Sequence, residues 1–124
     1  CRAVGGCPTG EARITPGFAL TARHVIHAVG PVYHRYRPVE AASLLASAYR
    51  SSLELASQHD LKSVAFPSLS TGVYGYPIAE AAPVALRAVL DGVRTHPELQ
   101  LVRFVLRDDS WPAFAAALRR LVNV

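Results

Sequence analysis

Short apolar runs recur along the chain, and glycine, proline or polar residues close each one. Runs of this length, enriched in β-branched and aromatic residues and bounded by turn residues, predict strands. The pattern places buried strands at His24–Val29 and Ser63–Pro67, a third clear strand at Leu101–Leu106 and a short strand at Glu11–Thr15.

Between these runs, apolar residues recur at steps of three and four, which predicts amphipathic helices. We expect helices over Pro38–Gln58 and Pro77–Arg94, and a last helix around Pro112, because proline is tolerated in a first helical turn. The residues expected to face inward are Leu45, Ala48, Tyr49, Leu53, Ala56, Ile78, Ala82, Ala85, Val89, Val93, Phe114, Leu118, Leu121 and Val122, with Trp111 as a further packing residue.

Strands that alternate with helices in this way predict an α/β domain with a largely parallel sheet. Ligands of such sheets bind at the carboxyl ends of the strands. Two segments leave strand ends in this chain, one after Pro67 and one after Leu106. We therefore look for a binding site in these two segments.

The segment Ser68–Pro77, called the 68–77 loop below, joins a predicted strand to a predicted helix. Its glycines, Gly72 and Gly75, permit a close approach of the main chain to a ligand, so that N–H groups could converge on an oxyanion. The loop lacks the Gly-Lys-Ser/Thr of a P-loop and the glycine spacing of the dinucleotide motif. Composition alone leaves two interpretations open: a phosphate-binding loop, or a tight glycine turn with buried tyrosines.

Length and composition narrow the class of protein. The 124 residues suffice for one domain, and no run of about 20 apolar residues is present to span a bilayer. With no signal segment either, we expect a cytoplasmic protein. The net charge of +4 comes from scattered arginines, which could attract an anionic ligand but form no nucleic-acid track.

The remaining polar residues favour structural roles. His24 and His27 are three apart in a predicted strand and so point to opposite faces, where they cannot share a metal ion. Asp108 and Asp109 stand where a helix begins and suit capping. Ser70 lacks the Gly-x-Ser-x-Gly context of a hydrolase nucleophile. We expect no metal site, no cofactor and no catalytic residue within this chain.

The string Phe66–Pro77 (FPSLSTGVYGYP) closely resembles the phosphate-binding loop of macrodomains. Cys7–Thr15, Leu20–Ala22 and His24–Val32 resemble further family segments in the same order. Together, these segments resemble the MacroD-type, or O-acetyl-ADP-ribose deacetylase-like, branch of the macrodomains. This resemblance implies a three-layer α/β/α sandwich with a mixed, largely parallel sheet and ADP-ribose bound at the strand ends.

Carried over by position, the resemblance assigns diphosphate and distal-ribose contacts to Ser70, Thr71, Gly72, Val73, Tyr74 and Gly75. It places Leu106 and Arg107 on the adenine side, where many family members have an aromatic residue. Arg107 could stack on adenine in its place, or be an ordinary surface arginine.

Complete family members begin with a strand–loop–strand–helix segment that carries an asparagine motif and the catalytic aspartate, and no such motifs occur here. The resemblance therefore implies that residues 1–124 are the C-terminal portion of a macrodomain, which lacks the N-terminal strands and helix.

The intact form is expected to hydrolyse O-acetyl-ADP-ribose or to remove mono-ADP-ribose from proteins. A non-catalytic module that binds ADP-ribose, poly(ADP-ribose) or RNA is the alternative. Expected partners are ADP-ribose or its acetyl ester, an ADP-ribosylated protein and a complementary N-terminal fragment.

Overall fold

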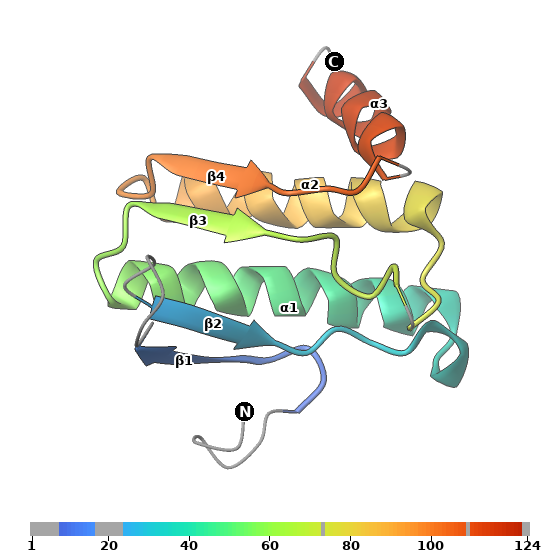
Figure 1. Ribbon diagram of the computed structural model, residues 1–124, viewed down its shortest axis with the longest axis horizontal. Helices are drawn as coiled ribbons and strands as arrows, with labels where there is room; N and C mark the ends of the chain where they lie inside the picture. The colour runs from blue at the N-terminus through green and yellow to red at the C-terminus, as the bar shows by residue number, and fades with distance from the viewer. Residues whose placement is uncertain (1–7, 17–23, 73, 109, 123–124) are drawn as a thin grey trace.

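The computed structural model describes residues 8–16, 24–72, 74–108 and 110–122. Its elements follow the predicted alternation of strands and helices (Figure 1). In chain order they are β1 (Ala12–Pro16), β2 (His24–Ala28), the 3-10 helix η2 (Tyr33–Arg35), α1 (Pro38–Gln58), β3 (Ser63–Phe66), α2 (Ile78–Thr95), β4 (Leu101–Phe104) and α3 (Trp111–Val122).

The strands form two separate pairs. β1 runs antiparallel to β2, with Ala12 opposite Ala28, and β3 runs parallel to β4, with Phe66 opposite Phe104. β2, β3 and β4 point in one direction, so their carboxyl ends lie at the same side of the molecule (Figure 1). The predicted α/β class with mixed strand pairing is therefore confirmed.

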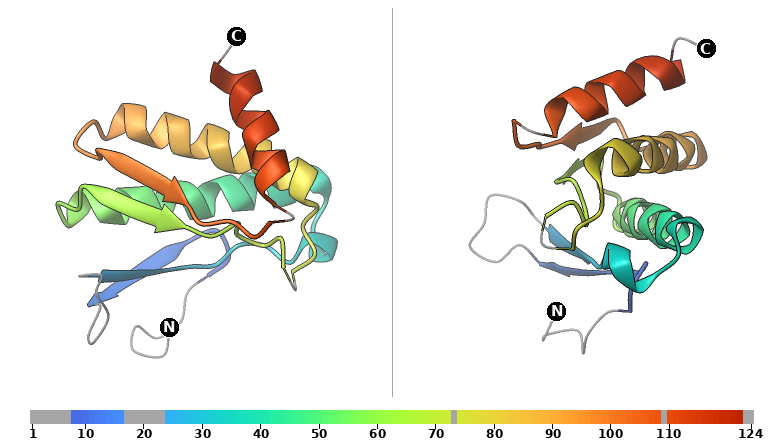
Figure 2. Two further views of the ribbon diagram at one scale, coloured as in Figure 1. Left: turned by 45° about the horizontal axis from the view of Figure 1, so that its top comes forward. Right: turned by 90° about the vertical axis from the view of Figure 1, so that its right-hand side faces the viewer.

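α1 and α2 lie next to each other on one face of the strands (Figures 1 and 2). α1 begins at Pro38, whose fixed φ and missing N–H suit the first helical position. All the residues predicted to face inward from α1 are buried, and those of α2 are buried or half-buried. No helix among the described residues is long and apolar enough to cross a membrane.

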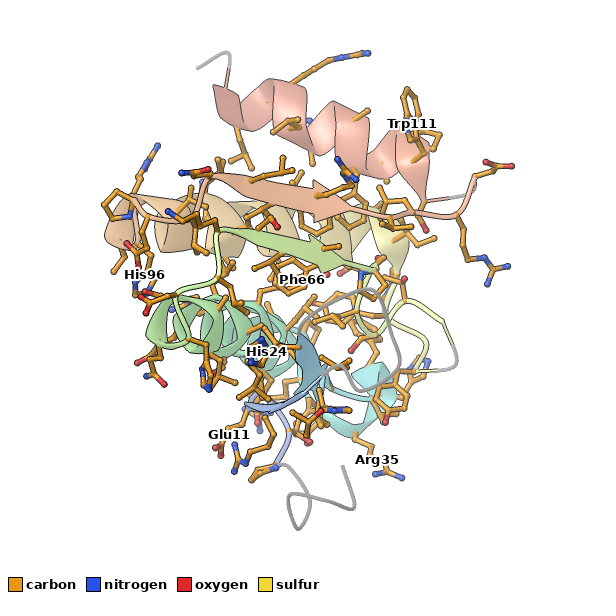
Figure 3. The ribbon with its side chains drawn as sticks, turned by 60° about the vertical axis from the view of Figure 1, so that its left-hand side comes forward. Glu11, His24, Arg35, Phe66, His96 and Trp111 are labelled. Carbon is orange, nitrogen blue, oxygen red and sulfur yellow. The ribbon has the colours of Figure 1, made fainter. Side chains whose placement is uncertain are left out.

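Aromatic rings connect the layers of the core. Tyr49 of α1 lies with its ring centroid 5.0 Å from that of Phe66 in β3, which points toward α1 (Figure 3). The ring centroids of Phe66 and Phe104 of β4 are 5.9 Å apart, and those of Phe104 and Phe114 of α3 are 5.2 Å apart. This continuous contact joins strands and helices that are distant in sequence and fixes the carboxyl ends of β3 and β4 relative to α1.

α3 corrects part of the prediction. Phe114 is buried and Leu121 packs against the core, as expected. Leu118, however, is 42% exposed and Trp111 is 61% exposed. Trp111 lies on the outer side of α3 (Figure 3). Leu118 instead borders an open hollow of about 430 Å³ that α2 and β4 also border, so α2 covers only part of its side chain. The side chain of Val122 lies outside the described residues.

The strands over His24–Val29 and Ser63–Pro67 were also predicted to be buried, whereas the observed burial is only partial. Every residue of β2 is half-buried. In β3 and β4, Phe66 is buried and Val64, Val102 and Phe104 are half-buried, while the alternate residues Ser63, Ala65, Leu101 and Arg103 are exposed. Side chains of a strand alternate between faces, and the described helices cover only one of them.

Candidate functional site

The 68–77 loop leaves the carboxyl end of β3 and leads into the amino end of α2. It lies at the side of the molecule where β2 and β4 also end (Figures 1 and 2). The amino end of a helix offers N–H groups without intrahelical partners and the positive end of the helix dipole. The position predicted from the strand and helix pattern is therefore the observed one.

Tyr49 anchors the start of this loop from α1. Its hydroxyl accepts a hydrogen bond from the Leu69 N–H at 3.0 Å and donates one to the Pro67 carbonyl at 3.4 Å. The side chain is 1% exposed, and burial raises the pKa of Tyr49 to about 12, opposed by the Leu69 hydrogen bond. The anchoring phenol therefore stays neutral throughout the physiological pH range.

Hydrogen bonds inside the loop fix its shape. The Tyr76 N–H donates to the Ser70 carbonyl at 2.9 Å, and the Gly75 N–H donates to the Gly72 carbonyl at 3.0 Å. The Thr71 hydroxyl donates to the Ser68 carbonyl at 3.1 Å. The Gly75 N–H already has an acceptor within the loop. Gly75 would therefore affect ligand binding only through the backbone conformation that it gives the loop.

Four other amides of the loop have no acceptor among the residues that the structure describes. They are the N–H groups of Ser70, Thr71, Gly72 and Tyr74. Main-chain amides gathered in a turn before a helix form a concavity that binds anions. Val73, which the sequence also assigned to this set, lies outside the described residues.

Ser70 adopts an unusual backbone conformation. Its φ is +67°, a left-handed angle that residues other than glycine rarely adopt, and Gly75 has φ +74°. The Ser70 hydroxyl is buried, with no hydrogen-bond partner in the described part of the chain. A Cβ built on Gly30 would overlap this hydroxyl oxygen. Gly30 is thus a supporting residue that the sequence pattern did not reveal, since it follows a strand as any turn glycine would.

Two hollows flank the loop and share Gly72. One, of about 330 Å³, is bordered by the end of β2 and by Gly30, Ser70 and Tyr74. The other, of about 150 Å³, is bordered by Ser68, Thr71, Arg107 and Ser110. A Cβ on Gly72 would meet no atom within 4 Å, so the space beside this residue is open. An extended ligand could pass from one hollow to the other across the Gly72 main chain.

The two residues predicted for the adenine side occupy different places. Arg107 borders the smaller hollow, opposite Thr71 and Ile78. Leu106 is half-buried and packs against the core. Of this pair, only Arg107 is placed where it could contact a ligand beside the loop.

The segment that follows β2 holds the far side of the loop. The Tyr33 N–H of η2 donates to the Tyr74 carbonyl at 2.9 Å, and the Tyr33 and Tyr76 ring centroids are 4.8 Å apart. The Tyr33 hydroxyl reaches Glu80 of α2 at 3.3 Å. Burial, and after it the Glu80 charge, raises the pKa of Tyr76. Sequence reasoning did not include Tyr33, because its contacts join segments far apart in the chain.

The histidines of β2 point apart, as their spacing predicted. Nε2 of His27 lies 2.9 Å from the Thr15 hydroxyl of β1, whereas the His24 ring packs on the His59 ring at 5.5 Å. In the described ranges, no group of three histidine, cysteine, aspartate or glutamate side chains could hold a metal ion. Asp109 and both cysteines lie outside these ranges.

A family model for the macro domain matches residues 1–85. A macro domain-containing protein of Ralstonia nicotianae is 60% identical over 89 residues, which make up 72% of this chain and 52% of the relative. The ADP-ribose glycohydrolase MACROD2 of Xenopus laevis is 51% identical over 89 residues, 72% of this chain and 21% of that protein.

The chain is also similar to solved structures of macrodomains. A macrodomain of Oceanobacillus iheyensis, a mutant solved with ADPR, superposes with a TM-score of 0.88 at 41% identity, over 95% of this chain and 63% of the neighbour. The chain spans roughly half to two thirds of the length of the first curated relatives that it matches.

Proposed function

Because the chain belongs to the macrodomain family, we propose that it binds ADP-ribose and holds the diphosphate on the main-chain amides of the 68–77 loop. The observation that carries this proposal is the set of amides at Ser70, Thr71, Gly72 and Tyr74. They lack acceptors within the described residues and stand between two hollows. The solved Oceanobacillus neighbour supports the choice of ligand, because its structure was determined with ADPR.

The unequal hollows suggest how the ligand lies. A diphosphate at Gly72 would place one nucleotide half on each side of the loop. We assign the distal ribose to the larger hollow, where Gly30 and Tyr74 border it. We assign the adenine side to the smaller hollow, where the planar guanidinium of Arg107 can stack on a base.

For the whole protein, we further propose hydrolysis of ADP-ribose linkages, as in removal of mono-ADP-ribose from proteins or cleavage of O-acetyl-ADP-ribose. The named activity of the Xenopus relative supports this choice. Activation of a water molecule requires a positioned base or charge, and the 68–77 loop contains no carboxylate or imidazole side chain to supply it. Release of ADP-ribose from a modified protein by the whole protein would be the supporting result. If the whole protein binds ADP-ribose but releases none from the modified protein, its function is recognition of ADP-ribose without turnover.

A nucleic-acid or poly(ADP-ribose) scaffold is the competing function, favoured only by the net charge of +4. Binding that depends on phosphate neutralisation weakens steeply with salt. A cradle of neutral main-chain amides should respond to salt far less. Affinity for an oligonucleotide and for ADP-ribose, measured over the same salt series, distinguishes the two functions.

Gly72 is the position at which to test the proposed diphosphate site. The open space beside this residue means that Gly72→Glu should fold normally while it places a negative charge next to the ligand. We expect an affinity loss of at least about tenfold by titration calorimetry, equivalent to about 1.4 kcal/mol. Gly72→Ala adds bulk without charge and should lose less.

Val39→Glu provides a control for the added charge, because Val39 is 81% exposed and borders neither hollow. It should bind ADP-ribose as the unmodified chain does. An unchanged affinity in a folded Gly72→Glu variant would remove the loop from the binding site.

A further inference from the structure

The 3-10 helix η2 lies next to the part of the 68–77 loop that borders the larger hollow (Figures 1 and 2). The Tyr33 N–H donates to the Tyr74 carbonyl at 2.9 Å. The His34 ring lies 3.6 Å from the point where a Cβ on Gly75 would stand. Only two residues separate Gly30 from η2. η2 is therefore adjacent to the hollow to which we assign the distal ribose.

The distal ribose is the part of the ligand that carries the acceptor in an ADP-ribosylated protein. The acceptor chain would therefore leave the ligand at the larger hollow, beside η2. An extended chain advances by about 3.5 Å per residue, so acceptor residues two to four positions from the modified one lie roughly 7–14 Å from it. Exposed side chains of η2 and of the residues after it are thus placed to contact the acceptor chain.

Two exposed arginines stand at this place. Arg35 ends η2 and points outward (Figure 3), and Arg37 directly precedes α1. The Arg35 guanidinium has no ion-pair or hydrogen-bond partner among the residues that the structure describes. Arg37 lies 3.9 Å from Glu40, and the two side chains are 89% and 59% exposed. An exposed pair at this distance contributes little, so it leaves Arg37 available to another carboxylate.

The second carboxylate of this region does not occupy Arg35 either. Glu80 of α2 accepts the Tyr33 hydroxyl hydrogen bond, with its two oxygens at 3.3 and 3.4 Å from the hydroxyl oxygen. It forms no ion pair with Arg35 or Arg37. The two guanidinium groups are therefore open to carboxylates from outside the chain.

We infer that Arg35 and Arg37 form an acceptor-binding surface, which recognises carboxylate side chains close to the modified residue of an ADP-ribosylated protein. The inference rests on the proposed function, because the bound ADP-ribose brings the acceptor chain to this surface. Arginine presents a planar fork of donors that matches a carboxylate in a bidentate pair. Exposed charge contacts of this kind add selectivity among acceptors more than they add affinity.

A nucleic acid is the other polyanion that arginines could bind. Its phosphates repeat along the strand and call for a continuous basic stripe. Here Glu40 and Glu80 lie beside the two arginines and interrupt such a stripe. Separate carboxylates of a peptide can meet each guanidinium without meeting the glutamates. The observations therefore favour an acidic polypeptide.

A pair of ADP-ribosylated peptides tests this surface on the whole protein. Both peptides carry one ADP-ribose on the same residue, through a linkage that resists hydrolysis. Glutamates occupy the positions two to four residues away on each side in one peptide, and glutamines occupy them in the other. We expect the glutamate peptide to bind about threefold or more tighter, measured by competition against fluorescent ADP-ribose.

Two double variants show whether the arginines cause this preference. Arg35→Gln with Arg37→Gln removes two charges but keeps long polar side chains, and should lower the preference below about 1.5-fold. Its affinity for free ADP-ribose should stay within about twofold of the parent value. Arg119→Gln with Arg120→Gln is the matched control, because these arginines are exposed on α3, away from η2 (Figures 1 and 2). The control lowers the net charge equally and should retain the preference.

The outcomes separate this inference from the proposed function. Equal binding of the two peptides by a protein that binds free ADP-ribose would overturn the acceptor-binding surface alone. The same conclusion follows if the preference survives the changes at Arg35 and Arg37, or disappears in the α3 control. Absence of any binding of free ADP-ribose would overturn the proposed function and this inference with it. An ADP-ribosylated oligonucleotide that binds tighter than the glutamate peptide, and loses that advantage in the Arg35 and Arg37 variant, would assign the surface to nucleic acid and overturn the inference.

Discussion

The Ser70 hydroxyl occupies the space that a side chain on Gly30 would fill. Gly30 follows β2, whereas Ser70 stands in the loop after β3, so the contact joins the carboxyl ends of two strands from different sheets. Ser70 itself has a left-handed backbone conformation, from which the loop turns toward Gly72. The shape of the candidate diphosphate site thus depends on a residue outside the loop.

This contact predicts the behaviour of Gly30→Ala. The added methyl overlaps the Ser70 hydroxyl, so that side chain must rotate or move together with its loop, at a cost of up to about 1–3 kcal/mol in the free energy of unfolding. ADP-ribose affinity should fall as well, because the amides of the loop would lose their arrangement. Chemical denaturation and calorimetry measure the two effects.

Ser70→Gly should reverse the damage. It removes the overlapping hydroxyl and suits the positive φ at this position. In the double variant, the stability lost by Gly30→Ala should largely return, whereas a double variant as unstable as Gly30→Ala would refute the contact. Ser70→Gly alone should cost nothing, and the gain could reach about 0.5 kcal/mol if relief of backbone strain exceeds the added chain entropy.

Tyr49→Phe tests the anchor of the loop from α1. The substitution keeps the buried ring but leaves the Leu69 N–H without its acceptor. A buried donor without a partner costs about 1–3 kcal/mol. Thermal unfolding should show this loss. The ring contact with Phe66 is retained, so an unaltered melting temperature would mean that solvent satisfies Leu69 and that the anchor is dispensable.

The same phenol predicts how stability depends on alkaline pH. Burial raises the pKa of Tyr49 from 10.0 to about 12 in the folded chain, so folding favours the neutral form. Its contribution is complete below pH 10 and is lost as the pH rises from 10 toward about 12. A shift of this size corresponds to about 2–3 kcal/mol.

The decline should be smaller in Tyr49→Phe, which has no phenol to ionise at this position. Tyr76, whose pKa is also raised by burial and by Glu80, adds to the decline in both proteins and cancels in the comparison. Identical losses in the two proteins between pH 10 and pH 12 would show that Tyr49 does not couple folding to pH.

The sequence predicted the order of the elements, the faces of α1 and α2, and the position of the loop, because each follows from local periodicity or from a strand-to-helix junction. It mispredicted Trp111 and Leu118, since an apolar stripe does not reveal how much of its width a neighbour covers. Gly30 and Tyr33 were missed for a different reason: their contacts with Ser70 and Tyr74 arise only when separate strands end at the same place. The resemblance selected the residues of the loop, and packing determined which of their amides remain available.

Arg107 provides the last prediction, because the chain has Leu106 and Arg107 where the resemblance leads us to expect an aromatic side chain. Arg107 borders the smaller hollow, so Arg107→Ala should weaken binding of ADP-ribose by removing a planar group that stacks on adenine. A guanidinium stacked on a ring at an exposed site is worth about 0.5–1 kcal/mol, which corresponds to an affinity loss of about two- to fivefold. Ribose 5-phosphate, which lacks the base, should bind Arg107→Ala and the parent chain equally.

Arg107→Lys retains the charge without the planar group and therefore separates the contribution of charge from that of stacking. If Arg107→Lys binds ADP-ribose as the parent does, or if ribose 5-phosphate binding falls as much as ADP-ribose binding, Arg107 acts through its charge on the phosphates and the adenine assignment is wrong.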